Sequence, residues 1–145
     1  MKGMYTQRAP AVNEWTKRAF PPYDGGGKEK AGMDEKRPVA RKGELASTEG
    51  PAGIFRTTLS WDASIMLCHF SMRKGVKIPL HDHPASQNGY VIRGKLLFRR
   101  GVGETFIAEA GCSYVFSGGE PHGAEVLEEA EVIECFAPMR PEYTP

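Results

Sequence analysis

The chain has 145 residues, of which 40% are hydrophobic and 26% are charged, and its formal net charge at pH 7 is +1. This length suits one domain with a real core, and the near-neutral charge argues against nucleic acid or a membrane surface as a partner. Three cysteines are too few for a disulfide framework and fit a reducing compartment. No apolar run is typical of a signal peptide or a membrane span, so we expect a cytoplasmic protein.

Residues 1–45 have the composition of an arm that is partly disordered. Their charge is basic in excess, and the Gly- and Lys-rich stretch 21–43 offers few apolar side chains to bury, which favours a flexible segment. Residues 14–20 could form a short helix capped at its start. Its two large aromatic residues, Trp15 and Phe20, are expected to pack on the body of the protein or on a second copy.

From residue 46 the pattern changes to short apolar runs separated by turn residues, which is typical of strands. The predicted strands are 54–61, 64–72, 87–92, 95–100, 104–108, 113–116, 122–127 and 131–137. Glycines at Arg93-Gly94 and in 101–103 predict tight hairpin turns. Because about eight short strands must bury one face each, we expect residues 46–145 to form an all-β domain, a single barrel or jelly roll.

Residues 81–94, HDHPASQNGYVIRG, carry the strongest chemical signal. On a strand, His81 and His83 would point to the same face because alternate residues do so. Gln87 follows closely, and His122 begins a later predicted strand, so a rolled barrel can bring all four side chains to one point. Imidazole and amide ligands suit Ni, Zn, Fe, Mn or Cu. These four residues are therefore the candidate ligands of one divalent transition metal whose identity stays open.

The spacing around these residues resembles the two motifs of the cupin superfamily, in its RmlC-like form. The first motif corresponds to Gly75, His81, His83, Gln87 and Gly94, with Gln87 in the place of the usual Glu. The second corresponds to Gly111, Gly119 and His122. The resemblance extends over about residues 50–137 and implies a metal-binding cupin barrel. The fourth histidine, His69, falls outside both motifs and is expected to be a core or pocket residue.

The C-terminal stretch EVIECFAPMRPEY adds three candidate functional residues. Glu134 and Phe136 share a face of the last predicted strand, and Arg140 follows it. A carboxylate, an aromatic ring and an arginine near a metal could act as proton acceptor, stacking wall and carboxylate clamp. With the neutral ligand set, this tail resembles the KdgF-like cupins of pectin and alginate breakdown, which convert unsaturated monouronates to linear keto acids. The resemblance implies a small anionic substrate and Glu134, Phe136 and Arg140 as the catalytic trio.

Other interpretations stay open at this point. Phe136 could belong to the barrel core, with Glu134 and Arg140 as surface partners. A metal-dependent dioxygenase is a second enzyme class, although iron(II) sites that activate oxygen gain from a carboxylate ligand, which Gln87 is not. A non-catalytic sensor or binding module for a small sugar or acid is a third possibility. Because an unpaired edge strand favours association, we also expect a homodimer.

Overall fold

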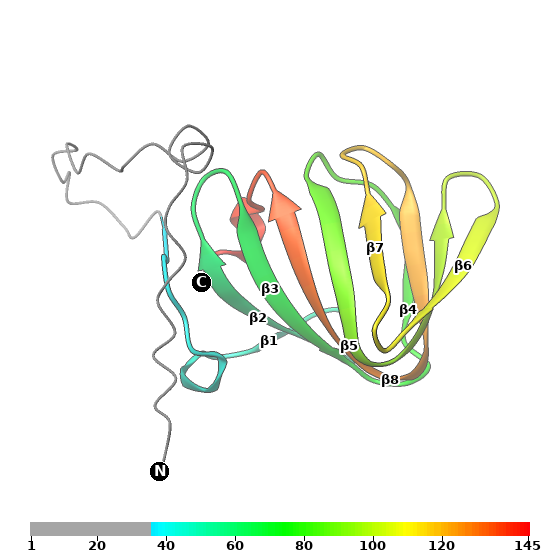
Figure 1. The fold of residues 1–145 in the computed structure, drawn as a ribbon, viewed down its shortest axis with the longest axis horizontal. Helices are drawn as coiled ribbons and strands as arrows, with labels where there is room; N and C mark the ends of the chain where they lie inside the picture. Colours follow the sequence, from blue (N-terminus) through cyan, green and yellow to red (C-terminus); the bar gives the residue numbers. More distant parts are fainter. Residues whose placement is uncertain (1–35) are drawn as a thin grey trace, which may run out of the picture. The chain divides into compact units, whose positions relative to one another are not determined.

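The structure, a computed structural model, describes residues 36–145. The predicted helix over 14–20, with Trp15 and Phe20, lies outside these residues. The described chain is almost entirely β structure (Figure 1). Its strands are β1 (Thr48–Glu49), β2 (Ile54–Trp61), β3 (Met66–Met72), β4 (Lys77–His81), β5 (Ser86–Arg100), β6 (Glu104–Glu109), β7 (Ser113–Phe116) and β8 (His122–Ala137). Two single-turn 3-10 helices, η1 (Lys42–Glu44) and η2 (Pro141–Tyr143), complete it, and none of the described helices is long and apolar enough to cross a membrane.

The two long strands, β5 and β8, organise the barrel. All pairings are antiparallel and follow the order β1-β2-β3-β8-β5-β6, while β4 also pairs with β8 and β7 with β5. The first part of β8 therefore lies between β4 and the end of β5, and its last part lies between β3 and the start of β5. Figure 1 shows both strands curving through the two halves of the fold. The predicted all-β jelly roll is confirmed.

Two predicted breaks between strands are wrong, because β5 continues through Arg93-Gly94 and β8 continues through residues 128–130. Arg93-Gly94 lies within β5, where the register against β8 shifts on both sides of residue 93. Gly94 has a φ of 89°, and a Cβ there would overlap with the backbone of Glu129 and Ala130. A glycine inside a strand serves a bulge and a close backbone approach as well as a hairpin. The glycine signal therefore marks the bend of two long strands, whereas the predicted turn at 101–103 does connect β5 to β6.

The sequence prediction omitted the edge strand β4, although the ends that it gave for most other strands are close to those in the structure. The segment KIPLH is mostly exposed and contains Pro79, so it lacks the alternation of a half-buried strand. Proline is tolerated there because, within residues 36–145, β4 pairs with β8 alone. By contrast, 54–61 and 113–116 form strands with the predicted bounds.

The described end of the predicted arm runs along β2. The backbone of Arg37 pairs with Trp61, and its guanidinium donates to the carbonyl of Thr58 over 3.0 Å. The hydroxyl groups of Ser47 and Thr57 lie 2.6 Å apart. This segment therefore lies along the same edge of β2 as β1 does. The domain boundary at residue 45 stays a prediction.

Alternation along β5 determines which side chains enter the barrel. Gln87, Gly89 and Val91 are buried, while their neighbours at 88, 90 and 92 are exposed. The interior is filled by apolar side chains from every long strand, among them Met66, Val91, Leu96, Phe116, Val126, Val132 and Phe136. Gln87 is thus a polar side chain on the otherwise apolar inner face of β5, and it is only 7% exposed. Polar groups buried in this way need partners, which makes the interior around Gln87 the place to look for a site.

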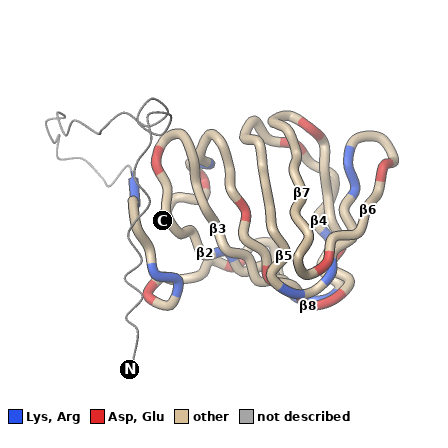
Figure 2. Tube along the Cα trace, in the orientation of Figure 1, with Lys and Arg blue, Asp and Glu red and all other residues tan. Residues whose placement is uncertain are grey.

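Residues of opposite charge lie close together along the chain trace where β5 and β8 bend (Figure 2). Arg93 pairs with Glu129 at 3.2 Å and with Glu131 at 3.4 Å, and Lys95 pairs with Glu128 at 3.3 Å. Exposed pairs of this kind contribute little stability each. They do, however, neutralise the basic residues of this bend.

Candidate metal centre and cavity

Three histidines converge inside one end of the barrel. His81 ends β4 and is the backbone partner of His122, the first residue of β8. His83 lies two residues beyond β4, in the loop that leads into β5. One ligating nitrogen from each of the three lies within 4.8 Å of the others. The prediction that His81 and His83 share a strand is therefore wrong, because the chain leaves the ladder at residue 82 and Pro84 has no N–H with which to continue it.

Each of the three imidazoles is oriented by a backbone carbonyl. Nδ1 of His81 lies 2.9 Å from the oxygen of Pro79, Nδ1 of His83 lies 2.8 Å from that of Ala85, and Nδ1 of His122 lies 2.8 Å from that of Glu120. Since a carbonyl oxygen only accepts, each Nδ1 must carry the proton, which leaves a lone pair on each Nε2. Nε2 of His122 is buried and has no hydrogen-bond partner among the described residues. A cation at this point would satisfy it.

Gln87 adds an oxygen to the same cluster. Its Oε1 lies 3.1 Å from Nε2 of His83, so two acceptors face each other with no proton between them. Burial is the main cause that lowers the pKa of both His83 and His122. The lowered pKa values favour the neutral form of both rings. Two ligands at right angles about 2.1 Å from an ion would be about 3 Å apart. The contact therefore fits neighbouring ligands of one metal ion.

Aromatic side chains hold the cluster from the apolar side. The ring of Phe116 stacks on His122 with 4.5 Å between centroids and 8° between planes. Phe136 meets His83 edge to face at 6.0 Å. Imidazole nitrogens and an amide oxygen are suitable donors for a divalent transition metal. The residues present fit such an ion, and the set is neutral, so a bound ion would keep its full charge.

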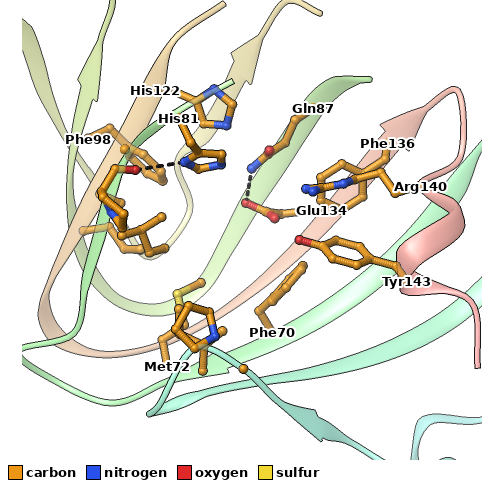
Figure 3. A pocket seen from close by; sticks show the side chains of 18 residues that line it. Phe70, Met72, His81, Gln87, Phe98, His122, Glu134, Phe136, Arg140 and Tyr143 are labelled. Atoms are coloured by element: carbon orange, nitrogen blue, oxygen red, sulfur yellow. Dashed lines mark hydrogen bonds between the residues drawn. The ribbon is translucent and has the colours of Figure 1, made fainter. Parts of the chain in front are cut away.

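Glu134 lies inside the barrel beside Gln87 rather than at the surface (Figure 3). Its Oε1 accepts hydrogen bonds from the amide Nε2 of Gln87 at 2.7 Å and from the hydroxyl of Tyr114 at 2.6 Å. Burial raises the pKa of Glu134, while these two hydrogen bonds and the charge of Arg140 offset part of the rise. A buried carboxyl group with a raised pKa can hold or release a proton nearer to neutral pH than an ordinary one.

Arg140 lies between two aromatic rings at the other side of the cavity (Figure 3). Its guanidinium carbon lies 5.4 Å from the ring centre of Phe136 and 4.1 Å from that of Tyr143, in η2. Nε donates to Glu142 over 2.8 Å, and the Arg140 side chain is 16% exposed. Stacking and this ion pair hold a cation in place beside the cavity.

A cavity of about 290 Å³ connects these groups. Of the predicted site residues, His81, Gln87, His122, Glu134, Phe136 and Arg140 line it, and His83 contacts it through Gln87. The rest of its wall is mainly apolar, with Ile54, Phe70, Met72, Ile78, Leu96 and Phe98. A mostly apolar cavity with a few convergent polar groups is typical of a small-molecule site. His69 lies outside the histidine cluster, with its Nε2 3.6 Å from Glu131.

Sequence reasoning missed two tyrosines of the site. Tyr143 lines the cavity and stacks on Arg140. Tyr114 donates to Glu134 from β7. Alternation within 113–116 could have placed Tyr114 inside, since Phe116 faces the same way, but nothing in the sequence relates it to a residue twenty positions later.

This fold and histidine cluster define the class of protein. Residues 68–136 match the family described as the cupin domain. This part of the chain is thus a cupin domain, as its motif spacing predicts. No curated protein is similar enough in sequence to be matched.

Solved structures extend the comparison. An RmlC-like cupin from Shewanella frigidimarina is 22% identical, with a TM-score of 0.71 over 76% of this chain and 99% of that one. KdgF from Halomonas sp. is 25% identical, with a TM-score of 0.69 over 73% of this chain and 99% of that one. Ectoine synthase from P. lautus is 19% identical, with a TM-score of 0.62 over 69% and 77%. Because such different proteins share the fold, the function must be argued from the site.

Proposed function

We propose that this cupin is a metal-dependent enzyme that opens and ketonises an unsaturated monouronate, a small anionic sugar acid. The observation that carries the proposal is the buried carboxyl group of Glu134, which shares one cavity with a neutral cluster of metal ligands and with Arg140. The similarity to KdgF from Halomonas sp. supports it. The ligands would be His81, His83, Gln87 and His122, and the substrate-facing trio would be Glu134, Phe136 and Arg140.

The proposed reaction is an isomerisation and needs no oxidant or further reactant. The hydroxyl group on C1 of the ring loses its proton and the ring oxygen gains one as the bond between C1 and the ring oxygen breaks, which leaves an aldehyde and an enol. The enol then loses its O–H proton and C4 gains one, which gives the ketone. No atoms are lost overall, so the catalytic task is to move protons and to stabilise negative charge on oxygen.

The residues of the cavity are suited to these tasks. Arg140 would bind the carboxylate of the substrate, and Phe136 would pack on the ring. Glu134 would accept and return the proton, because burial raises the pKa of its carboxyl group. A divalent ion held by the three histidines and Gln87 supplies a Lewis acid that favours the developing negative charge. The apolar wall keeps water away from the enol.

The test is an assay with the unsaturated monouronates that pectin and alginate lyases release. Ketonisation removes the double bond that is conjugated to the carboxylate, and this bond gives the substrate its ultraviolet absorbance. The absorbance should therefore fall faster when the protein is present than when it is absent. Chelation should abolish this rate, and added metal should restore it. A metal-loaded protein that leaves the absorbance decay unchanged would contradict the proposal.

The same assay separates the alternatives. A dioxygenase would require oxygen, so an equal rate under anaerobic conditions excludes that class. A binding or sensor module would bind the acid, seen by calorimetry, without turning it over. Chemical conversion of any unsaturated monouronate by the metal-loaded protein excludes that module.

We further propose that the chain works as a cytoplasmic homodimer. Tyr90 and Ile92 on β5 and Val115 on β7 are apolar or aromatic side chains on the outside of the barrel, and each is at least 41% exposed. Exposed apolar side chains on neighbouring strands favour association. Light scattering should give twice the mass of the chain, and Tyr90→Ser with Ile92→Ser should lower it to that of one chain. A monomeric wild-type protein would contradict the dimer.

A further inference from the structure

Three residues from three neighbouring strands form a row across the inside of the sheet. Gly89 of β5 is the backbone partner of Tyr114 in β7 on one side and of Glu134 in β8 on the other. Side chains of residues paired in this way normally lie next to each other on the same face. Here the middle member has no side chain, so the outer two can meet above it.

Gly89 makes this contact possible. A Cβ at residue 89 would overlap with the ring and the hydroxyl oxygen of Tyr114, because the ring lies directly over the glycine. Phe98 packs against the ring with 4.3 Å between centroids, and Tyr114 is only 5% exposed. Within the described residues the hydroxyl group donates to Oε1 of Glu134. A buried tyrosine hydroxyl needs such a partner, so the row determines where Oε1 lies.

The position of Oε1 in turn decides which end of the Gln87 amide faces the histidines. The amide nitrogen donates to Oε1 of Glu134, so the amide oxygen faces Nε2 of His83. In the reversed orientation the NH2 group would donate to Nε2 of His83, and both atoms would be lost as ligands. The two orientations occupy almost the same space, so hydrogen bonding is what distinguishes them.

We propose that Tyr114 is a positioning residue of the metal site: it holds Glu134 so that Gln87 presents its amide oxygen, and not its nitrogen, to the ion. Without the hydroxyl group, the Glu134 carboxylate can turn toward Arg140, whose charge already acts on it. Gln87 is then free to rotate and to donate to His83. The inference rests on the proposed metal site and adds to it the outer groups that orient a ligand.

The test measures metal binding to metal-free protein, by competition with a chromophoric chelator for Zn²⁺ and by the visible absorption of bound Co²⁺. Tyr114→Phe removes only the hydroxyl group and should weaken the affinity by about 10-fold, the lower end for groups that orient a ligand, and should shift the Co²⁺ bands. Ser113→Ala is the control, because it removes a hydroxyl group from the exposed face of β7, the strand that carries Tyr114. It should leave affinity and spectrum unchanged.

Two further variants separate positioning from a general loss of structure. Gly89→Ala keeps the hydroxyl group but displaces the ring, so it should reproduce the effect of Tyr114→Phe. In a Gln87→Ala background there is no amide to orient. Tyr114→Phe should then cause no further loss of affinity, which makes the two effects non-additive.

The outcomes distinguish the inference from the proposed function. If the wild-type chain binds neither ion, both are wrong. If it binds them and Tyr114→Phe binds equally tightly with the same Co²⁺ spectrum, the metal site stands and the role of Tyr114 is overturned. An equal loss from Tyr114→Phe in the Gln87→Ala background also overturns it, because the effect then does not pass through Gln87.

Discussion

The two polar sides of the cavity are held by different kinds of contact. On the histidine side, His81, His83 and His122 are each oriented by a backbone carbonyl within two residues of themselves. On the carboxylate side, Glu134 depends on two side chains from other strands, Gln87 and Tyr114. The first side is fixed by local chain geometry, and the second by a chain of side-chain hydrogen bonds.

The difference has a consequence for how each side responds to change. A histidine oriented by its own backbone can lose a neighbouring ligand and keep its place. Hydrogen-bonded side chains in a buried network are coupled, so the removal of one partner leaves the others to rearrange. We therefore expect substitutions on the histidine side to remove the metal without disturbing the rest of the site, and substitutions that break the hydrogen bonds of the carboxylate side to act on several properties together.

The largest effect is expected on the histidine side. His122→Ala removes the buried Nε2 that lacks a partner in the described part of the chain, so the metal content of the purified protein should fall close to background. The strands should persist, because the core is formed by other residues, and circular dichroism should show unchanged β structure. His69→Gln is the control on the neighbouring strand β3 and should keep its metal. Equal metal content in wild type and His122→Ala would contradict the site.

Glu134→Gln is expected to have the next largest effect. Gln can accept the same hydrogen bonds from Gln87 and Tyr114, so metal affinity should change little. It cannot accept or return a proton, so kcat should fall by roughly 10²–10⁴-fold, the usual contribution of a positioned acid–base group. Steady-state kinetics of metal-loaded protein measures this. An unchanged kcat would exclude Glu134 as the proton carrier.

The histidine side could largely be predicted from the sequence. His81, His83, Gln87 and His122 recur at a characteristic spacing, and the fold then brings them to one cluster. The four side chains cluster as predicted although one premise was wrong, because His83 lies in a loop and not on a strand; that they bind a metal stays a prediction. The spacing of the residues predicted that they cluster, while strand alternation predicted the wrong local structure for His83.

The carboxylate side was predicted only in part. Glu134 and Phe136 were placed on one face by alternation, and both do line the cavity. The partners of Glu134 could not be found in this way, because Tyr114 and Gln87 reach it through pairings between strands far apart in the chain. The long strands were missed for a similar reason: Gly94 is typical of a turn when judged locally, and only the register shift of β5 against β8 shows that it belongs to a bulge.

Arg140→Ala should have a smaller effect, on substrate binding rather than on chemistry. Hydrogen bonds to a charged group contribute about 1.5–3 kcal/mol, so KM should rise about 10- to 100-fold with kcat much less affected. Arg140→Lys keeps the charge but not the paired donors, so its KM should lie between those of wild type and Arg140→Ala. A KM that does not change in Arg140→Ala would exclude the clamp.

The smallest effect concerns the stability of the metal-free protein and tests the burial of Glu134 directly. Burial raises the pKa of Glu134 above its usual value of 4.5, so in the window above pH 4.5 the folded chain keeps a proton that the unfolded chain has lost. The free energy of unfolding must then fall as the pH rises through this window. Glu134→Gln removes this contribution, so the difference in unfolding free energy, variant minus wild type, should increase with pH and then level off. Urea unfolding at a series of pH values measures it, and the histidines cancel because both proteins contain them.

Glu131, on the same strand, should change the pH dependence of the unfolding free energy in the opposite direction. Burial alone would raise the pKa of Glu131, but the charges of Arg93, Lys42 and His69 together lower it. Here the unfolded chain holds the extra proton just below pH 4.5, so the stabilisation is present above that pH and is lost as the pH falls. Glu131→Gln should therefore be less stable than wild type above pH 4.5, with the deficit shrinking as the pH falls below it. A difference for Glu134→Gln that stays flat would mean that Glu134 is solvated and that the carboxylate side of the cavity is open to water. A difference that follows the same direction as Glu131→Gln would mean that the hydrogen bonds of Glu134 and the charge of Arg140 outweigh its burial.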